Sequence, residues 1–310
     1  MEKILITGGA GFIGSSLAER LLKTGNYFVV LVDNLLTGSL QKIPSHNNCR
    51  FIKCDVNNYN DISAIMTSYQ FDYVFHYAAV VGVKRTIEIP IMVLSDLQGI
   101  KNILDLCKNT GVKRVFFSSS SEVYGEPVEL PQHEETTPLN SRLPYAVVKN
   151  AGESFCKSYF REFGLNYTIF RFFNTYGPKQ STDFVISKFI KAALTNQPIT
   201  IYGNGKQTRT FCYIDDNTNC ILKILAEGHV MNDVINVGND TDVTILELAE
   251  LIIRLTNSKS KIDFLPPLAE GDMTRRLPDS EKMKKIIGRD FVSLEEGLTR
   301  VLKSEMIFLK

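Results

Sequence analysis

The sequence lacks the charge excess and the cysteine and histidine patterns that mark nucleic-acid-binding, membrane-binding, zinc-binding and disulfide-rich proteins. Its 35 Lys and Arg residues are balanced by 34 Asp and Glu residues, so a formal net charge of +1 offers no basic surface to nucleic acid or an anionic membrane. The six cysteines form no Cys-x-x-Cys pair and only four histidines are present, so neither a zinc cluster nor a disulfide framework is indicated. We therefore expect buried free thiols, no bound metal, and neither nucleic acid nor membrane as a partner.

The sequence also lacks a long apolar run. No run approaches the roughly 20 residues that a membrane span needs, and a strand pattern begins near the first residue, so we expect a soluble, cytoplasmic protein. A chain of 310 residues, 44% of them hydrophobic, is long enough for one large domain or two fused domains with a sizeable core.

Short apolar runs alternate with helical patterns along the first half of the chain. Six of these runs predict strands, at residues 3–7, 28–32, 51–54, 73–76, 115–118 and 167–171. Nearly continuous apolar strands separated by helices indicate a parallel sheet that is covered on both faces. The expected fold class is α/β, with a doubly wound parallel sheet.

After about residue 172 the alternation of strands and helices ends, and Pro and Gly residues divide the chain into shorter segments. Two helical stretches are predicted, near 244–256 and 280–304. The change indicates a smaller C-terminal α/β domain. We predict that residues 1–172, with a return segment near 211–237, form the first domain. Residues 173–210 and 238–310 then form the second.

A glycine-rich loop follows the first predicted strand and opens a helix. Gly8, Gly11 and Gly14 allow a tight turn and let a pyrophosphate approach the backbone N–H groups at the helix start, where Phe12 and Ile13 also lie. Such a loop alone is a weak signal, but a strand before it, a helix after it and an acid at the end of the second strand strengthen it. The first domain is therefore predicted to be a dinucleotide-binding Rossmann domain.

The acid that ends the second strand is Asp33. Its carboxylate suits the ribose hydroxyls of an adenosine and would repel a 2′-phosphate. Asn34 follows it, so no arginine directly after Asp33 compensates this charge. The sequence therefore predicts NAD, and not NADP, as the cofactor.

Two further strand ends contribute to the same predicted site. Asp55 and Val56 follow the third strand, where Asp55 is a candidate partner for the adenine edge; the alternative is an aspartate that only shapes a turn. Ala78 and Ala79 follow the fourth strand and leave space for the dinucleotide to cross the strand ends.

A second motif, Tyr145-Ala-Val-Val-Lys149, places two side chains one helical turn apart on the same face. An ammonium near a phenol lowers the pKa of the phenol and makes it a usable base. The motif is common by chance, but the strand upstream ends in a run of serines that includes Ser120 and Ser121, followed by Glu122. These groups lie at the carboxyl edge, where such sheets keep their active sites, and packing alone does not explain them.

Together these motifs resemble those of the extended short-chain dehydrogenase/reductase family, which contains nucleotide-sugar epimerases, dehydratases and decarboxylases. The similarity runs nearly end to end. It implies that Ser120 hydrogen-bonds the sugar hydroxyl, that Tyr145 takes the 4-hydroxyl proton, and that Lys149 holds the nicotinamide ribose and tunes Tyr145. NAD would be a reusable cofactor, because a transient 4-keto sugar is made, changed and usually reduced again.

The resemblance also implies a site for a nucleotide-sugar substrate. Asn174 and Arg209 match family residues that contact the diphosphate, and Arg276 matches an arginine near the phosphates and sugar. A planar guanidinium grips two phosphate oxygens at once; the alternative for each arginine is a surface ion pair. Lys84, after the fourth strand, is a further candidate for the substrate. The resemblance also implies a homodimer that is formed through the helix carrying Tyr145.

The pair Ser121-Glu122 bears on the reaction. Decarboxylases of UDP-glucuronate and 4,6-dehydratases of the GDP-mannose type carry a similar Ser-Glu, where Glu122 would serve chemistry at C5 and C6. In decarboxylases an arginine like Arg276 meets the sugar carboxylate. Against this, Ser121 replaces the Asp of dTDP-glucose dehydratases, the loop 80–86 is closer to epimerases and dehydratases, and Asp96 replaces a structural asparagine.

The resemblance therefore predicts an NAD-dependent lyase or isomerase of a nucleotide-sugar. Decarboxylation or 4,6-dehydration is favoured, and 4-epimerisation remains the alternative. A reductase and a non-catalytic dinucleotide-binding regulator are remote alternatives, and a regulator would have little reason to keep Ser120, Tyr145 and Lys149 together.

Overall fold

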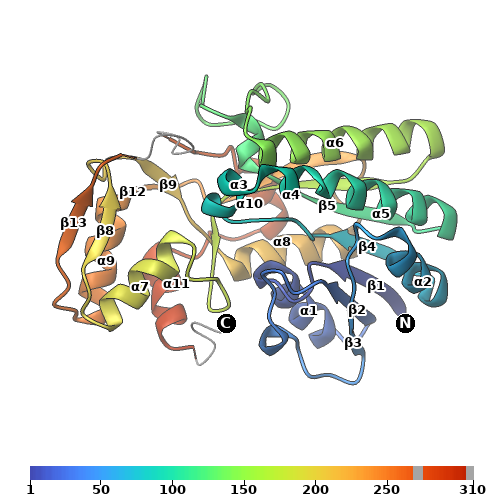
Figure 1. The fold of residues 1–310 in the computed structure, drawn as a ribbon, viewed down its shortest axis with the longest axis horizontal. Coiled ribbons are helices and arrows are strands. Elements are labelled where there is room, and N and C mark those ends of the chain that lie inside the picture. The colour runs from blue at the N-terminus through green and yellow to red at the C-terminus, as the bar shows by residue number, and fades with distance from the viewer. Residues whose placement is uncertain (268–274, 305–310) are drawn as a thin grey trace.

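The computed structural model describes residues 1–267 and 275–304, apart from the side chains of Val83, Lys84 and Ile87. Figure 1 shows a central sheet with helices on both sides and a second group of elements at one end of the molecule. None of the helices within the described ranges is long and apolar enough to cross a membrane. All six cysteines are buried free thiols.

The central sheet has seven strands, which lie in the order β11-β6-β5-β4-β1-β2-β3, and every neighbouring pair is parallel. In chain order the strands are β1 (Glu2–Thr7), β2 (Tyr27–Asp33), β3 (Cys49–Lys53), β4 (Tyr73–His76), β5 (Arg114–Ser120), β6 (Tyr167–Phe172) and β11 (Asp233–Val237). The doubly wound α/β fold is confirmed. The order reverses between β1 and β4, and ligands of such sheets bind outside the carboxyl ends at this point.

Helices cover both faces of the sheet, as Figure 1 shows for α5 and α6 on one side and α1 and α8 on the other. One face carries α2 (Tyr59–Tyr69), α5 (Asp96–Thr110) and α6 (Pro144–Phe163); the other carries α1 (Phe12–Lys23), α8 (Ile214–Glu227) and α10 (Glu281–Ile287). Side chains alternate along a strand, so Leu5 packs with the first group while Ile4 and Ile6 pack with the second. Each fully buried Leu or Ile side chain contributes about 1.5–3 kcal/mol.

The second group of elements has an apolar core of its own, drawn mainly from α7, β8, α9 and α11. It consists of α7 (Val185–Leu194), β8 (Ile199–Tyr202), β9 (Thr208–Thr210), β12 (Asp242–Thr244), α9 (Ile245–Thr256), β13 (Ile262–Leu265) and α11 (Leu294–Leu302). Phe12 and Ile13 of α1 pack against this core, and α8, β11 and α10 belong with the sheet. The division of the chain into two domains stays a prediction.

Two sequence-based expectations differ from the structure. The helical stretch expected near 280–304 is two helices, because Gly288 adopts a left-handed conformation with φ of 70° and ends α10. Ser293 then caps α11 by accepting a hydrogen bond from the Glu296 N–H. The seventh strand, β11, is not among the six predicted strands, because it follows the region in which the regular alternation of strands and helices has ended.

Candidate active site

A cavity of about 1030 Å³ lies along the carboxyl ends of β1, β2, β4, β5 and β6. This volume is at the upper end for a ligand pocket, which suits two ligands side by side. Most residues predicted for the site line it, namely Gly8, Gly11, Phe12, Ile13, Gly14, Asp33, Asn34, Asp55, Val56, Ala78, Ala79, Ser120, Ser121, Glu122, Tyr145, Lys149, Asn174 and Arg276.

Two predicted substrate residues stand apart from this set. Arg209 is buried in β9 and is not among the described lining residues; its Nη1 donates to the Thr208 carbonyl at 2.8 Å. Lys84 lies in α3 (Val83–Glu88), and its side chain lies outside the described part of the structure. Both therefore stay predictions. Asn174 lines the cavity, and its Nδ2 donates to the Thr210 carbonyl at 3.1 Å.

The glycine-rich loop fits the backbone of its neighbours closely. Gly8 has a φ of +67°, and a Cβ there would lie 2.8 Å from backbone atoms of Tyr77 and Ala78. A Cβ on Gly14 would lie 2.6 Å from the Gly8 carbonyl oxygen. The helix α1 begins here with no side-chain cap, so the N–H groups of its first turn remain for an anion at the cavity. The loop therefore fits the pyrophosphate of a dinucleotide.

Asp33 is held in one orientation by the loop and by the chain that follows. Its Oδ2 accepts from the Ala10 N–H at 3.1 Å and its Oδ1 from the Leu35 N–H at 2.7 Å. Burial raises the pKa of this carboxyl, and the two backbone hydrogen bonds oppose that rise. A Cβ on Gly38 would lie 2.8 Å from Asp33 Oδ1, so the segment after β2 packs directly on the carboxylate.

Lys42, which sequence reasoning did not single out, lines the same cavity. It ends the short helix η1 (Leu40–Lys42) and is only 4% exposed. Burial and the nearby Lys179 lower the pKa of Lys42, while Asp33 raises it. Within the described residues its ammonium has no hydrogen-bond or ion-pair partner. No local motif marks this lysine, because only the fold brings it to Asp33.

The predicted catalytic groups meet where β5 ends and α6 begins. Lys149 Nζ donates to Ser118 Oγ at 3.2 Å and lies 5.7 Å from the centre of the Tyr145 ring. Ser120 lies near the Tyr145 hydroxyl and lowers the pKa of that phenol. Ser120 Oγ accepts from the Glu122 N–H at 3.2 Å, which caps the short helix η2 (Ser121–Tyr124). Serine, tyrosine and lysine therefore form one cluster.

The charges of this cluster differ from the sequence-based expectation. Burial raises the pKa of Tyr145 well above its usual range, Glu122 adds to the rise, and Ser120 opposes it. Lys149 lies over the ring of the phenol, and the cost of burying a phenolate dominates. Burial also lowers the pKa of Lys149 to about 8, with Asp96 opposing.

Asp96 lies at the start of α5. Its Oδ2 accepts from the Val80 N–H at 2.7 Å, so it holds the chain that follows β4. Burial raises the pKa of Asp96 and the charge of Lys149 opposes the rise. The carboxylate lines the cavity, so this chain has one more negative charge beside Lys149 than an asparagine would give.

An ion pair that the sequence did not predict lies next to the cluster. Glu122 Oε1 and Arg276 Nη2 are 2.7 Å apart, and their side chains are 21% and 8% exposed. Arg276 Nε is buried and has no hydrogen-bond partner within the described residues. One edge of the guanidinium is thus paired with Glu122, while another donor of the same group is left unsatisfied.

A doubly wound sheet with an uncapped glycine-rich loop, an acid at the end of β2 and a Ser-Tyr-Lys cluster at its carboxyl edge defines a dinucleotide-dependent enzyme. The chain belongs to the NAD dependent epimerase/dehydratase family, whose model matches residues 4–238. It is therefore an NAD-dependent enzyme, as the sequence predicted.

Known proteins with several activities are similar to this chain. A UDP-N-acetyl-alpha-D-glucosaminuronate decarboxylase of Bacillus cytotoxicus is 37% identical over 97% of each chain. The solved UDP-glucose 4-epimerase of Thermotoga maritima with UDP-glucose has a TM-score of 0.91 and 31% identity over 97% of each chain. The UDP-glucuronic acid 4-epimerase of Bacillus cereus, in complex with UDP-glucuronic acid and NAD, has a TM-score of 0.87 and 31% identity over 96% of each.

Proposed function

We propose that this protein is an NAD-dependent decarboxylase of a nucleotide uronate. The observation that carries the proposal is the ion pair of Glu122 and Arg276 beside Ser120 and Tyr145. The guanidinium of Arg276 lines the cavity beside Glu122 and can hold a uronate carboxylate, whereas a neutral hexose has no group of matching charge for it. Similarity to a nucleotide-uronate decarboxylase supports the choice.

In the proposed reaction Ser120 hydrogen-bonds the 4-hydroxyl oxygen of the sugar and Tyr145 takes its proton. NAD, when bound, supplies the chemistry of accepting hydride from C4 and returning it at the end of each turnover. Arg276 holds the carboxylate β to the new 4-ketone. The C5–C6 bond then breaks and its electron pair passes into an enolate as carbon dioxide leaves. Glu122 acts as the general acid that passes a proton from water to C5. Glu122 remains as the partner of Arg276, so no buried charge is left unpaired.

The same proposal assigns the cofactor contacts to residues of this chain. The glycine-rich loop from Gly8 to Gly14 holds the pyrophosphate, and Asp33 holds the adenosine ribose. Lys149 holds the nicotinamide ribose. We add Lys42, because a buried ammonium without a partner among the described residues, at the cofactor cavity, is suited to an anion.

The remaining contacts follow from the sequence. Asn174 and Arg209 are proposed for the diphosphate, with Lys84 as a further substrate contact. Arg276 is proposed for the sugar carboxylate, since its partner Glu122 follows the serines at the end of β5. A homodimer through α6 is also proposed; apolar side chains such as Val147 and Phe163 are exposed on that helix, and sedimentation of the purified protein tests it.

The experiment that tests the function is incubation with NAD and UDP-glucuronate, N-acetylated UDP-uronates and the matching neutral UDP-hexoses, with products identified by mass. The expected result is loss of one carbon dioxide from a uronate and no product from the hexoses. Loss of one water would indicate dehydration. An unchanged mass with altered sugar couplings in the NMR spectrum would indicate epimerisation, and either result would reject decarboxylation.

A second candidate is 4-epimerisation, because Ser120, Tyr145 and Lys149 are sufficient for it and both solved structures named above are 4-epimerases. Glu122→Gln separates the two. A decarboxylase variant should still reduce bound NAD, seen in the absorbance of the nicotinamide, but form product at least about a hundredfold more slowly. A 4-epimerase variant should keep nearly full turnover. A variant that does not reduce NAD would show that Glu122 only shapes the site.

A further inference from the structure

Glu122 and Arg276 lie far apart in the sequence, and each is anchored by hydrogen bonds behind the cavity. Glu122 belongs to η2, which ends at Tyr124. Arg276 directly precedes residues 277–280, which belong to no helix or strand. The separation of the two charges therefore depends on what holds these two segments.

The η2 segment is held through the hydroxyl of Tyr124. This hydroxyl donates to Asn236 Oδ1 at 2.7 Å and accepts from Arg171 Nη1 at 2.9 Å. Tyr124 is buried, and burial raises the pKa of its phenol to about 12, so the hydroxyl remains a donor at any working pH. The end of η2 is thus tied to β11, the strand that carries Asn236.

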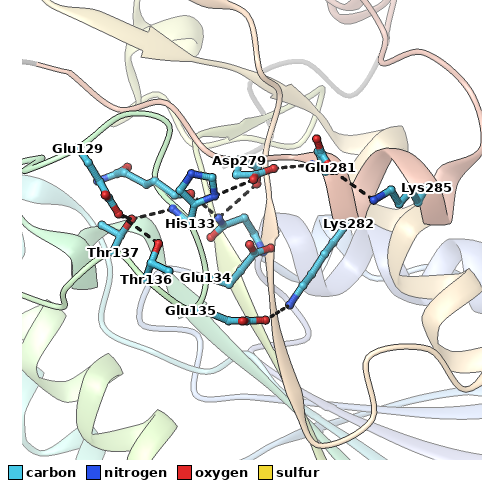
Figure 2. A network of polar contacts seen from close by, with 12 residues as sticks. Glu129, His133, Glu134, Glu135, Thr136, Thr137, Asp279, Glu281, Lys282 and Lys285 are labelled. Carbon is cyan, nitrogen blue, oxygen red and sulfur yellow. Dashed lines mark hydrogen bonds and ion pairs between the residues drawn. The ribbon is translucent and has the colours of Figure 1, made fainter.

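The segment after Arg276 is held against the loop that precedes α6. Gln132 N–H donates to the Leu277 carbonyl at 2.7 Å, and Asp279 N–H donates to the Gln132 carbonyl at 2.8 Å. Figure 2 shows His133 meeting Asp279 and Lys282 reaching Glu135, with separations of 2.7 Å for His133 Nδ1 to Asp279 Oδ2 and 3.4 Å for Lys282 Nζ to Glu135 Oε1. We call the paired segments 132–135 and 277–282 the clasp.

The side chain of Asn236 joins the two anchors. Its Oδ1 accepts from Tyr124, and its Nδ2 donates to the carbonyls of Gln132 at 2.9 Å and Asp279 at 3.3 Å. The residue is fully buried, and its own N–H donates to Glu134 Oε1 at 2.9 Å. Every donor and acceptor of this amide is therefore engaged, with η2 on one side and the clasp on the other.

We propose that Asn236 is a positioning residue, which sets the separation of Glu122 and Arg276 and thereby the preference of the site for an anionic sugar. Only the identity of the sugar rests on the proposed function. An ion pair in a partly buried cavity depends steeply on distance, and a shift of about 1 Å in either backbone changes how Arg276 divides its donors between Glu122 and a substrate carboxylate.

Tyr124→Phe tests the link, because it removes one hydroxyl and little volume. Tyr159→Phe is the matched control: it removes a buried hydroxyl that donates to Asp105 Oδ1 at 2.7 Å, and Tyr159 does not line the cavity. Only part of the loss of the two hydrogen bonds of Tyr124 reaches the ligand, so we expect Tyr124→Phe to weaken UDP-glucuronate binding to the NAD-loaded protein about three- to tenfold in calorimetry. UDP-glucose binding should weaken by less than about twofold. The control should keep the wild-type ratio of the affinities for UDP-glucuronate and UDP-glucose. Equal weakening of both ligands by Tyr124→Phe, or no change, would overturn the proposal.

A double-mutant cycle with Arg276→Met tests the route of the effect. If Asn236 acts through Arg276, Tyr124→Phe should cause no further loss of UDP-glucuronate affinity once Arg276 is gone; additive losses would contradict the proposal. If Tyr124→Phe does not fold, Asp279→Asn at the partly exposed rim of the clasp replaces it. This variant should lower the affinity for UDP-glucuronate about twofold.

If the proposed function is wrong, the products formed by the wild-type protein show it. The wild-type protein would then convert a neutral nucleotide-sugar, or leave the mass of a uronate unchanged. In that case the cycle is measured on kcat/KM for the nucleotide-sugar that is converted. The effect of Tyr124→Phe must still vanish without Arg276, and additivity would overturn the positioning role whatever the reaction.

Discussion

The two ends of the cavity are built in different ways. Apart from Lys149, the proposed cofactor end consists of backbone N–H groups and side chains in the loops that follow β1 to β4, all within the first 80 residues. The proposed sugar end consists of side chains from η2, α6, the chain after β6 and residue 276, and buried hydrogen bonds lie beneath it. Backbone geometry suits one ligand that many relatives share, whereas a set of side chains allows one fold to accept different sugars.

The polar network under the sugar end extends to the serines of β5. Arg171 and Glu153 form a buried ion pair of 2.7 Å, and Ser119 donates to Glu153 at 2.5 Å. Removing one partner of a buried ion pair costs about 3–5 kcal/mol, because the other charge is left unpaired. Changes of specificity are therefore more easily made at Glu122 and Arg276, which face the cavity, than in the network beneath them.

The largest expected effect comes from the residue that lies between the two ends. Tyr145→Phe should reduce turnover of any nucleotide-sugar by about a thousandfold or more, because no base remains for the 4-hydroxyl proton. Binding of NAD and of the nucleotide-sugar should stay within about twofold, since the substitution removes a single hydroxyl from a site that holds both ligands through many other groups. Turnover and calorimetry on the same preparation check this. Substantial remaining turnover would remove Tyr145 from the chemistry.

Gly14→Ala should affect the cofactor end alone. The added Cβ would lie 2.6 Å from the Gly8 carbonyl oxygen, so the loop has to shift by an amount that costs about 1–3 kcal/mol. The dissociation constant for NAD, measured by calorimetry, should rise about tenfold or more. UDP binding should be unchanged. A parallel loss of UDP binding would mean that the two ends are not independent.

NAD affinity should also depend on pH through Lys149. Its pKa of about 8 lies below the usual value of 10.5, so the ammonium is present below about pH 8 and absent above it. If the ammonium holds the nicotinamide ribose, NAD affinity should fall by up to about tenfold per pH unit above that point. Lys149→Met should bind NAD weakly at every pH, without this dependence. A wild-type affinity that does not vary with pH would contradict the role.

The smallest expected effect is that of Lys42→Met, which keeps the bulk of the side chain and removes its charge. NAD affinity should fall about threefold, the lower scale of a charge-assisted hydrogen bond. Lys53→Met, exposed and outside the cavity lining, is the matched control and should change nothing. NAD should still bind more tightly than NADP because Asp33 remains. Equal or tighter binding of NADP to the wild-type protein would contradict the role of Asp33.

The residues that the sequence predicted for the cofactor lie together at the cavity, because their motifs are local. Six strands appear as apolar runs, and Gly8 to Gly14 and the Tyr145–Lys149 spacing are short motifs whose geometry one turn of helix determines. The place of Lys42 at the cofactor cavity and the pairing of Glu122 with Arg276 join segments that only the fold brings together. No spacing rule indicates such pairs. The strand that supplies Asn236, β11, lies where strands and helices no longer alternate regularly, so it was not predicted.

The position of β11 has a consequence for how the molecule is assembled during synthesis. Six of the seven sheet strands have been made by Phe172, but the outer edge of β6 stays unpaired until β11 emerges from the ribosome. An open strand edge is a place where another chain can pair, so this interval is when a nascent chain is most exposed to aggregation. Asn236 lies in the same strand and is synthesised with it. The strands that form the dinucleotide crevice are therefore synthesised before the residue that we propose sets the preference for a sugar.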